Sequence, residues 1–280
     1  MTTFEASGLP ALPEPLLGDE MALLLCRLAL AARAETLPRF RRLPPPENKA
    51  AAGAFDPVTE ADRAAEAAIR AILAETCPAD AILGEEEAAL AGTSGVTWVI
   101  DPIDGTRAFV AGLPTWGTLI ARDDGHAASH GIVDHPVTRE LFLGVTGVGA
   151  WLLGPESSAP VRASRVETLA DATLISTSPD LFHGAEAEAF AVLRQMTRDT
   201  RYGTDCYGYS MVAAGCADLV VENGLAAYDI AGPKAVVEAA GGIVTDWQGG
   251  ECRWGGRVVA AATPALHAAA LEVLSRVPAG

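Results

Sequence analysis

The stretch Trp98-Val-Ile-Asp-Pro-Ile-Asp-Gly-Thr106 carries the strongest signal of fold and function in this chain. Its first residues are apolar and predict a short strand, beyond which Asp101 and Asp104 lie three residues apart. The proline between them stiffens the turn and Gly105 allows an unusual backbone angle, so both carboxylates can point at one centre. Hard cations such as Mg²⁺ take oxygen ligands, and the carbonyl of Ile103 offers a third oxygen. A polar turn held by its own hydrogen bonds is the alternative, because Asp-Gly pairs are common in turns.

Two more acidic positions lie upstream of this stretch. Gly84-Glu-Glu-Glu87 follows a short apolar run, and three adjacent negative charges cost free energy unless solvent or a cation compensates them. A solvated acidic loop is the alternative. Asp62 follows Thr59 at the spacing of a helix capping box, so spacing alone predicts a structural role for it.

The composition indicates a folded globular protein with an acidic surface. Half of the 280 residues are hydrophobic, enough for one large domain or two closely packed halves. The 36 Asp and Glu against 20 Lys and Arg give a formal charge of −16, which argues against a nucleic-acid partner. Anionic substrates would also be repelled, unless some carboxylates hold divalent cations that invert the local field.

The cysteines and the apolar runs predict the compartment. The five cysteines are odd in number and form no Cys-x-x-Cys pair, which fits neither a disulfide framework nor a zinc site. No secretion signal is recognisable at the N-terminus, and no apolar stretch approaches the ~20 residues of a membrane span. We therefore expect a cytoplasmic enzyme without a membrane partner.

Periodicity and turn residues predict two closely packed halves, 16–153 and 154–280, after a loose arm over residues 1–15. The first half is α+β and the second alternates as in α/β folds, and the crevice between them is the expected ligand site. In the first half we predict helices over 16–40 and 60–76, the latter capped by Thr59, a loop over 47–55, and strands at 81–84, 97–100, 116–121, 131–133 and 140–145. In the second half we predict strands at 173–176, 218–222 and 242–245 and helices over 185–196 and 230–240.

The chain resembles the inositol monophosphatase family along about residues 16–275. Five segments carry the resemblance, in order: Asp56-Pro-Val-Thr-Glu-Ala-Asp62, Gly84-Glu-Glu86, Trp98 to Thr106, Tyr228-Asp-Ile-Ala-Gly232 and Glu238-Ala-Ala-Gly-Gly242. This combination is far more specific than any single short motif. The resemblance implies the layered α-β-α-β-α sandwich of the sugar phosphatases, a homodimer, and a Mg²⁺-dependent phosphatase of the lithium-sensitive type that acts on a small phosphorylated metabolite.

The resemblance also implies a ligand set for two or three Mg²⁺ ions. Carried over position by position, Glu85, Asp101 and the Ile103 carbonyl would bind a first ion. Asp101, Asp104 and Asp229 would bind a second, and a weaker third ion would share Glu85. Such an arrangement suits phosphoryl transfer, because two ions can stabilise the attacking and the leaving oxygen of an in-line displacement.

Roles for water and phosphate follow from the same resemblance. A water molecule is the expected nucleophile, and its proton would be drawn toward Thr106, whose hydroxyl Asp62 polarises. Glu85 would take part in catalysis through the metal. The N–H groups of Gly105 and Thr106 would face the phosphate at the start of a helix. No catalytic His or Cys is required.

Three details resemble the bacterial histidinol-phosphate phosphatase branch of the family more than the inositol-selective one. They are Arg107, the run Pro114-Thr-Trp-Gly-Thr-Leu-Ile-Ala121, and Gly203-Thr-Asp-Cys-Tyr-Gly-Tyr209. Asp205 and Glu222 would suit the ammonium and imidazole of L-histidinol, although they could equally bind sugar hydroxyls. We therefore expect Arg107, Asp205 and Glu222 to bind substrate. Ile230-Ala-Gly-Pro-Lys234 departs from this branch and is more similar to general inositol or nucleotide phosphatases.

Several alternatives stay open from the residues alone. Arg107 holds either the phosphate or a nearby carboxylate. For Trp116, Tyr207 and Tyr209, packing in the core or at the rim is favoured over substrate contact. Inositol 1-phosphate and 3′-phosphonucleotides are alternative substrates. A metal-binding regulator without turnover is a hypothesis of another class, and the Thr106 and Asp62 pair argues against it.

Overall fold

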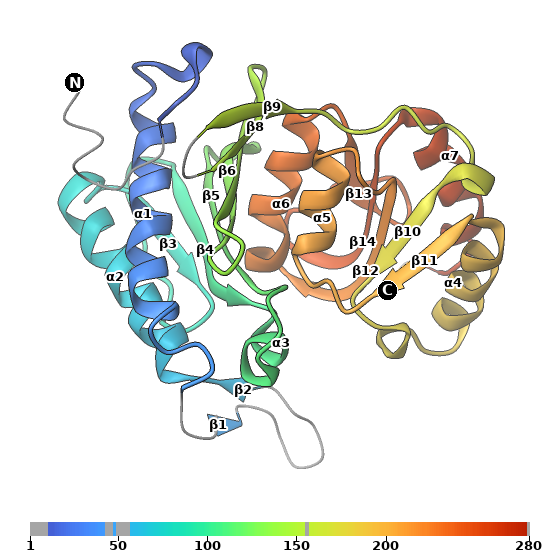
Figure 1. The fold of residues 1–280 in the computed structure, drawn as a ribbon, viewed down its shortest axis with the longest axis horizontal. Helices are drawn as coiled ribbons and strands as arrows, with labels where there is room; N and C mark the ends of the chain where they lie inside the picture. The colour runs from blue at the N-terminus through green and yellow to red at the C-terminus, as the bar shows by residue number, and fades with distance from the viewer. Residues whose placement is uncertain (1–10, 43–46, 49–56, 155–156, 279–280) are drawn as a thin grey trace.

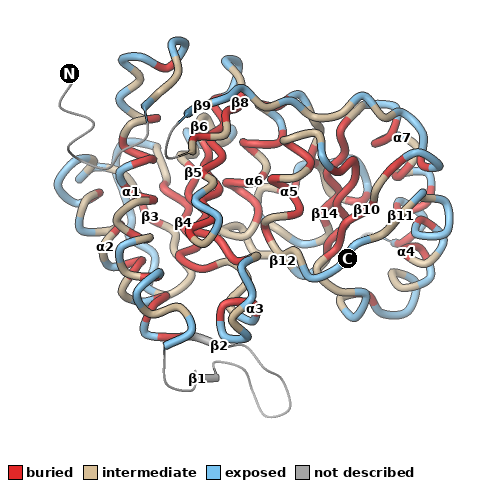
Figure 2. Tube along the Cα trace, in the orientation of Figure 1, coloured by how far each residue is buried: buried red, intermediate tan, exposed pale blue. Residues whose placement is uncertain are grey.

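The computed structural model describes residues 11–42, 47–48, 57–154 and 157–278. Within this part the elements form five layers, which Figure 1 shows from left to right as helices, sheet, helices, sheet and helices. Figure 2 shows that the buried residues run through both sheets and through the helices between them. The predicted layered α-β-α-β-α architecture is thereby confirmed. None of the described helices is both long and apolar enough to cross a bilayer.

The first layer consists of α1 (Glu20–Thr36) and α2 (Glu60–Thr76). Asp19 begins α1 by accepting the N–H groups of Met21 and Ala22, so the helix starts four residues later than predicted. α2 has the predicted bounds and the predicted Thr59 cap. Upstream, Glu14–Leu16 form the short 3-10 helix η1, and β1 (Glu47–Asn48) pairs with β2 (Pro57–Val58). The rest of the predicted arm and loop, residues 1–10 and 49–55, lies outside the described residues.

The second layer is a seven-stranded sheet in the order β3-β4-β5-β6-β7-β8-β9. Only the β3–β4 pair is parallel. Its strands are β3 (Ala81–Gly84), β4 (Thr97–Asp104), β5 (Gly117–Asp123), β6 (Ala128–His135), β7 (Glu140–Val145), β8 (Gly149–Leu153) and β9 (Ser158–Val161). On one face Trp98, Ile100 and Ile120 pack against Leu28 of α1 and Ile69 of α2 in one core.

The middle layer is α6 (Ala227–Ala239) with α5 (Tyr207–Ala213), and α6 lies directly on the other face of the seven-stranded sheet. Glycines allow this close contact. A Cβ at Gly144 would lie 2.6 Å from the Cα of Val236, and one at Gly232 would lie 2.9 Å from the carbonyl oxygen of Ile132. The N-terminal end of α6 is therefore held against the middle of the sheet.

The remaining layers are a five-stranded sheet, in the order β11-β10-β12-β14-β13, and the outer helices α4 (Ala185–Met196) and α7 (Pro264–Leu274). Two short 3-10 helices, η2 (Leu169–Asp171) and η3 (Pro179–Leu181), flank β10. The strands are β10 (Thr173–Ser176), β11 (Asp199–Tyr202), β12 (Leu219–Ala226), β13 (Ile243–Asp246) and β14 (Gly255–Ala261). Two contacts cross the predicted boundary at residues 153 and 154. β9 follows this boundary yet pairs with β8, and α6 of the second half covers the seven-stranded sheet. The division into two domains stays a prediction.

Candidate metal centre

A bulge in β4 places Asp101 and Asp104 on one face of the sheet. Asp101 lies opposite Leu119 and Asp104 opposite Gly117, so β4 has two residues where β5 has one. In a regular strand residues three apart point to opposite faces, and the extra residue cancels this alternation. The bulge forms at Pro102, which has no N–H to donate to the ladder. Both carboxylates thereby face α6 rather than α1 and α2.

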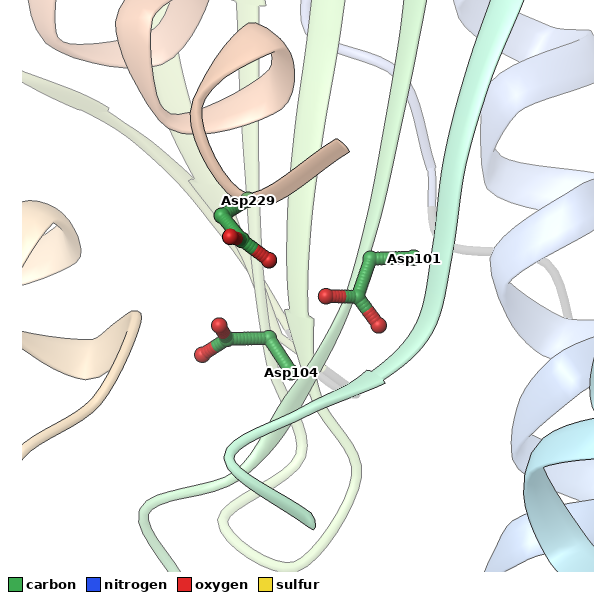
Figure 3. A group of neighbouring side chains, drawn as sticks. All are labelled: Asp101, Asp104 and Asp229. Carbon is green, nitrogen blue, oxygen red and sulfur yellow. The ribbon is translucent and has the colours of Figure 1, made fainter. Parts of the chain in front are cut away.

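Asp229, the third residue of α6, meets these two carboxylates. Figure 3 shows the three side chains converging on one space between the end of β4 and the start of α6. One oxygen of each carboxylate lies within 4.8 Å of the corresponding oxygens of the other two. A set of oxygen donors without nitrogen or sulfur suits a hard cation such as Mg²⁺.

Backbone N–H groups orient each carboxylate of this cluster. Each aspartate accepts one such hydrogen bond, which holds its side chain in a single direction. The donors are Ile103 to Asp101 (3.0 Å), Cys206 to Asp104 (2.8 Å) and Ala226 to Asp229 (2.6 Å). The contact from Cys206 ties the start of α5 to β4, so the cluster joins the seven-stranded sheet to both helices of the middle layer.

The electrostatics of the cluster favour a cation. Burial raises the pKa of Asp101 well above its usual value, and the negative charges of Glu85, Asp104 and Asp229 raise it further. Burial likewise raises the pKa of Asp104, with Asp205 and Asp229 adding to the shift. Negative charges gathered in a buried place repel one another, and a divalent cation would remove that cost. The donor set and the charge therefore both fit Mg²⁺.

Glu85 lies beside Asp101, since its side chain hydrogen-bonds Asp101 and raises the pKa of that carboxyl. The loop that carries Glu85 is held by Glu66 of α2. The Oε2 atom of Glu66 accepts the N–H of Glu86 at 2.8 Å, and Oε1 accepts that of Glu87 at 3.2 Å. Arg70 pairs with the same carboxylate at 2.7 Å. Sequence reasoning missed Glu66, although it follows Asp62 by one helical turn.

The predicted pair of Thr106 and Asp62 is brought together. The Thr106 hydroxyl lies 3.5 Å from Asp62 Oδ1 and 3.0 Å from the carbonyl oxygen of Ile103, its nearer acceptor. Asp62 is fully buried, and its Oδ2 also accepts the N–H of Thr59 at 2.9 Å. The capping role and the contact with Thr106 thus use different oxygens of one carboxylate.

Gly105 turns the chain from β4 into α3 (Thr106–Ala111) in a left-handed conformation, with φ of 77° and ψ of 39°. A Cβ at this position would lie 3.0 Å from the Cβ of Asp205. Both the backbone angle and the space therefore require glycine. Asp205 itself has a positive φ of 46°, which brings its side chain against the turn.

A pocket of about 180 Å³ connects the metal cluster with the predicted substrate residues. Asp104 and Asp229 line it together with Asp205, Tyr209 and Glu222. Its remaining lining comes from Thr177, Leu181, Cys206, Asn223, Gly224 and Leu225. This small acidic cavity lies between α5, β12 and the start of α6.

Asp205 and Glu222, the two predicted substrate carboxylates in this pocket, differ in their partners. Burial raises the pKa of Asp205, whereas the hydroxyl of Thr115, at 3.1 Å, and the charge of Arg107 lower it. The positive charge of Arg107 therefore favours the ionised form of Asp205. Interaction with a nearby carboxylate is one of the two alternatives predicted for Arg107. Glu222 accepts the N–H of Thr177 at 2.6 Å through Oε1, and burial raises its pKa to about 8.

Comparison with known proteins identifies the family. A family model described as the inositol monophosphatase family matches residues 19–279. The chain belongs to the inositol monophosphatase family. It is a phosphatase, and the family acts on small phosphorylated substrates, typically with magnesium.

Individual members of the family differ in the substrate that their names give. The chain is 37% identical over 231 residues to the bifunctional phosphatase IMPL2, chloroplastic, of Arabidopsis thaliana, which covers 79% of this chain and 66% of that protein. It is 34% identical over 271 residues to the histidinol-phosphatase of Mycobacterium tuberculosis, covering 92% and 98%. A solved structure of an inositol monophosphatase from Zymomonas mobilis has 37% identity and a TM-score of 0.80, covering 92% and 98%.

Other residues considered from the sequence take structural roles beside this family site. Trp116 packs edge-on against Phe109 at 4.9 Å between ring centroids, which confirms its predicted core position. The Tyr207 hydroxyl donates to Glu140 at 2.8 Å, outside the pocket. Lys234 pairs with Glu238 and donates to the carbonyl of Val244 at 3.1 Å, so it joins α6 to β13.

Proposed function

We propose that this chain hydrolyses L-histidinol phosphate to L-histidinol and phosphate. The observation that carries the proposal is the acidic pocket that opens from the carboxylate cluster, with Asp205 and Glu222 in its lining. A leaving group with an ammonium group and an imidazole offers the positive charge and N–H donors that such a pocket accepts. The Mycobacterium tuberculosis relative, which carries the name histidinol-phosphatase, supports the proposal.

The proposed cofactor is Mg²⁺, held by Glu85, Asp101, Asp104, Asp229 and the Ile103 carbonyl. Bound there, it would stabilise the negative charge of the transferring phosphoryl group and of the oxygens on either side of it. Asp101 hydrogen-bonds Glu85 and also has an oxygen within 4.8 Å of oxygens of Asp104 and Asp229, which supports its role as the ligand shared by two ions. A third ion beside Glu85 remains part of the proposal.

The chain's own groups then position water and phosphate. The Thr106 hydroxyl would accept or orient the proton of the attacking water, with Asp62 Oδ1 within 3.5 Å to polarise it. The Gly105 and Thr106 N–H groups would contact the phosphate at the turn into α3. Arg107 follows immediately and would contribute positive charge near both the phosphate and Asp205.

A panel of three substrates tests the proposal. Mg²⁺-dependent phosphate release is measured with histidinol phosphate, inositol 1-phosphate and adenosine 3′,5′-bisphosphate, each with an EDTA control. We expect the highest kcat/KM for histidinol phosphate and no release in EDTA. A clear preference for either of the other substrates would overturn the histidinol assignment, and an absence of turnover on all three would favour a metal-binding regulator.

Inositol 1-phosphate is the second candidate. The 37% identity to the Zymomonas mobilis inositol monophosphatase supports it, and Asp205 and Glu222 can accept hydrogen bonds from sugar hydroxyls. A 3′-phosphonucleotide is the third candidate.

A homodimer in the cytoplasm completes the proposal. All five cysteines are unpaired, which supports a reducing compartment. Sedimentation velocity would test the oligomer: a single species of twice the 28.9 kDa chain mass is expected, and a monomer would contradict the dimer.

A further inference from the structure

Tyr209 and Glu222 each bury a polar atom that has no hydrogen-bond partner within the protein. Among the described residues, six buried side-chain atoms are of this kind, and they include Tyr209 OH and Glu222 Oε2. Of the six, only these two belong to side chains that line the pocket beside the metal cluster. Tyr209 is 3% exposed and Glu222 is 2% exposed.

Such atoms are unfavourable for stability, because each loses its hydrogen bonds to water and gains none in return. Two such atoms in side chains that line one cavity indicate a place built for a polar ligand. Glu222 Oε1 already accepts the N–H of Thr177 at 2.6 Å, so Oε2 is the oxygen of this carboxylate that has no partner within the protein. Tyr209 lies close enough to Glu222, Asp104 and Asp229 for their charges to act on it. Tyr209 lines the pocket together with Glu222 and the metal carboxylates Asp104 and Asp229.

We propose that Tyr209 is a specificity-determining residue whose hydroxyl, together with Glu222, hydrogen-bonds the leaving group of the substrate. The inference rests on the proposed function. The phenol hydroxyl of Tyr209 can donate a hydrogen bond and the carboxylate of Glu222 can accept one. The pair would therefore favour a leaving group with one acceptor and one donor close together. A neutral imidazole has both on one ring, whereas an unsubstituted phenyl ring has neither.

Tyr207 provides a matched control on the same helix. Its hydroxyl donates to Glu140 at 2.8 Å, and the residue does not line the pocket. Tyr209→Phe and Tyr207→Phe each remove one hydroxyl from α5 and leave the ring in place. A difference between the two variants therefore reports on the pocket rather than on the helix.

The experiment compares kcat/KM of the wild type and both variants at saturating Mg²⁺, with histidinol phosphate and with phenyl phosphate. For Tyr209→Phe we expect a loss of about tenfold on histidinol phosphate, the size of one hydrogen bond, and less than about twofold on phenyl phosphate. Tyr207→Phe should change neither value by more than about twofold. An unchanged Tyr209→Phe, or equal losses on both substrates, would overturn the proposal.

Two further readouts keep the result interpretable. Binding of L-histidinol by calorimetry should weaken by about tenfold in Tyr209→Phe, and unchanged binding would also overturn the proposal. If the wild type prefers inositol 1-phosphate, the substrate assignment fails on that ranking alone. The Tyr209 variant is then compared on inositol 1-phosphate and phenyl phosphate. The role of Tyr209 is thereby tested independently of the substrate assignment.

Discussion

Two groups of carboxylates in this molecule differ in the charge of their neighbours. Where the first helical layer meets the seven-stranded sheet, Asp134 of β6 pairs with Arg33 of α1, and within α2 Glu66 pairs with Arg70. At the bulge of β4, the largest charge effects on Asp101 and Asp104 come from other carboxylates, and all of them raise the pKa. Asp134 and Glu66 are each neutralised by an arginine, whereas the metal cluster places several negative charges on one face of the sheet. This difference is what distinguishes structural carboxylates from a centre built for a metal.

The contrast predicts opposite stability effects for two similar substitutions. Asp104→Asn keeps an oxygen for the Cys206 N–H but removes one repelling charge, so in EDTA the variant should melt a few degrees higher than the wild type. Its kcat should fall by about a thousandfold or more, since metal stabilisation is worth several kcal/mol. Thermal melts and phosphate release check both outcomes.

Asp134→Asn is the control for this prediction. It leaves Arg33 without its carboxylate and should lower the free energy of unfolding by about 3 kcal/mol. If Asp104→Asn destabilised the metal-free protein as strongly, the two groups of carboxylates would not differ in the way described. Retained turnover in Asp104→Asn would contradict the two-metal proposal.

The sequence was sufficient to predict those features of the fold and the site that depend on residues close together in the chain. The bounds of α2 follow from the Thr59 cap, and the turn at Asp101 to Gly105 is visible in its Pro and Gly. Asp229 lies in a distant segment, and no periodicity links it to β4, so only the family resemblance placed it in the site. β8, β14 and α7 were missed, although Thr263 and Pro264 at the start of α7 are the cap and first residue typical of a helix N-terminus.

Glu66 and Tyr209 show why the rest of the site escaped prediction. A glutamate in an Ala-rich helix is usually solvated, yet Glu66 is fully buried because the loop of Glu85 folds over it. Tyr209 was assigned to packing, and its burial agrees with that. What the sequence could not reveal is that Tyr209 lines the pocket and that its buried hydroxyl has no partner, which depends on how α5 meets β12.

Glu66→Gln tests the residue that links the two groups of carboxylates. Glu66 pairs with Arg70 and also holds the loop that carries Glu85 beside the metal cluster. The amide loses one acceptor for the loop N–H groups and its charge pairing with Arg70, so Glu85 is held less firmly. We expect the Mg²⁺ concentration for half-maximal activity to rise by about tenfold, while kcat at saturating Mg²⁺ changes little. Arg33→Lys alters the buried pair of Arg33 and Asp134 and should leave the Mg²⁺ concentration for half-maximal activity unchanged. An unchanged Mg²⁺ requirement in Glu66→Gln would show that Glu66 does not position a ligand.

The smallest expected effect is on the pH dependence of stability. Because the pKa of Asp101 and of Asp104 is raised above 3.8 in the folded state, the folded protein binds more protons than the unfolded chain as pH rises past about 4. The melting temperature in EDTA should therefore fall as these groups ionise. Saturating Mg²⁺ should reduce that fall, because the metal favours the ionised carboxylates. Identical slopes with and without Mg²⁺ would count against the coupling.

The most direct measurement is a crystal structure grown with Mn²⁺ in place of Mg²⁺, with anomalous scattering used to locate the ion. The account predicts an anomalous peak at a distance of about 2.0–2.2 Å from a carboxylate oxygen of each of Asp101, Asp104 and Asp229. A second peak is expected between Asp101 and Glu85. Crystals without a peak among the three aspartates at saturating Mn²⁺, with the carboxylates still converging, would contradict the central claim that this cluster is a metal centre.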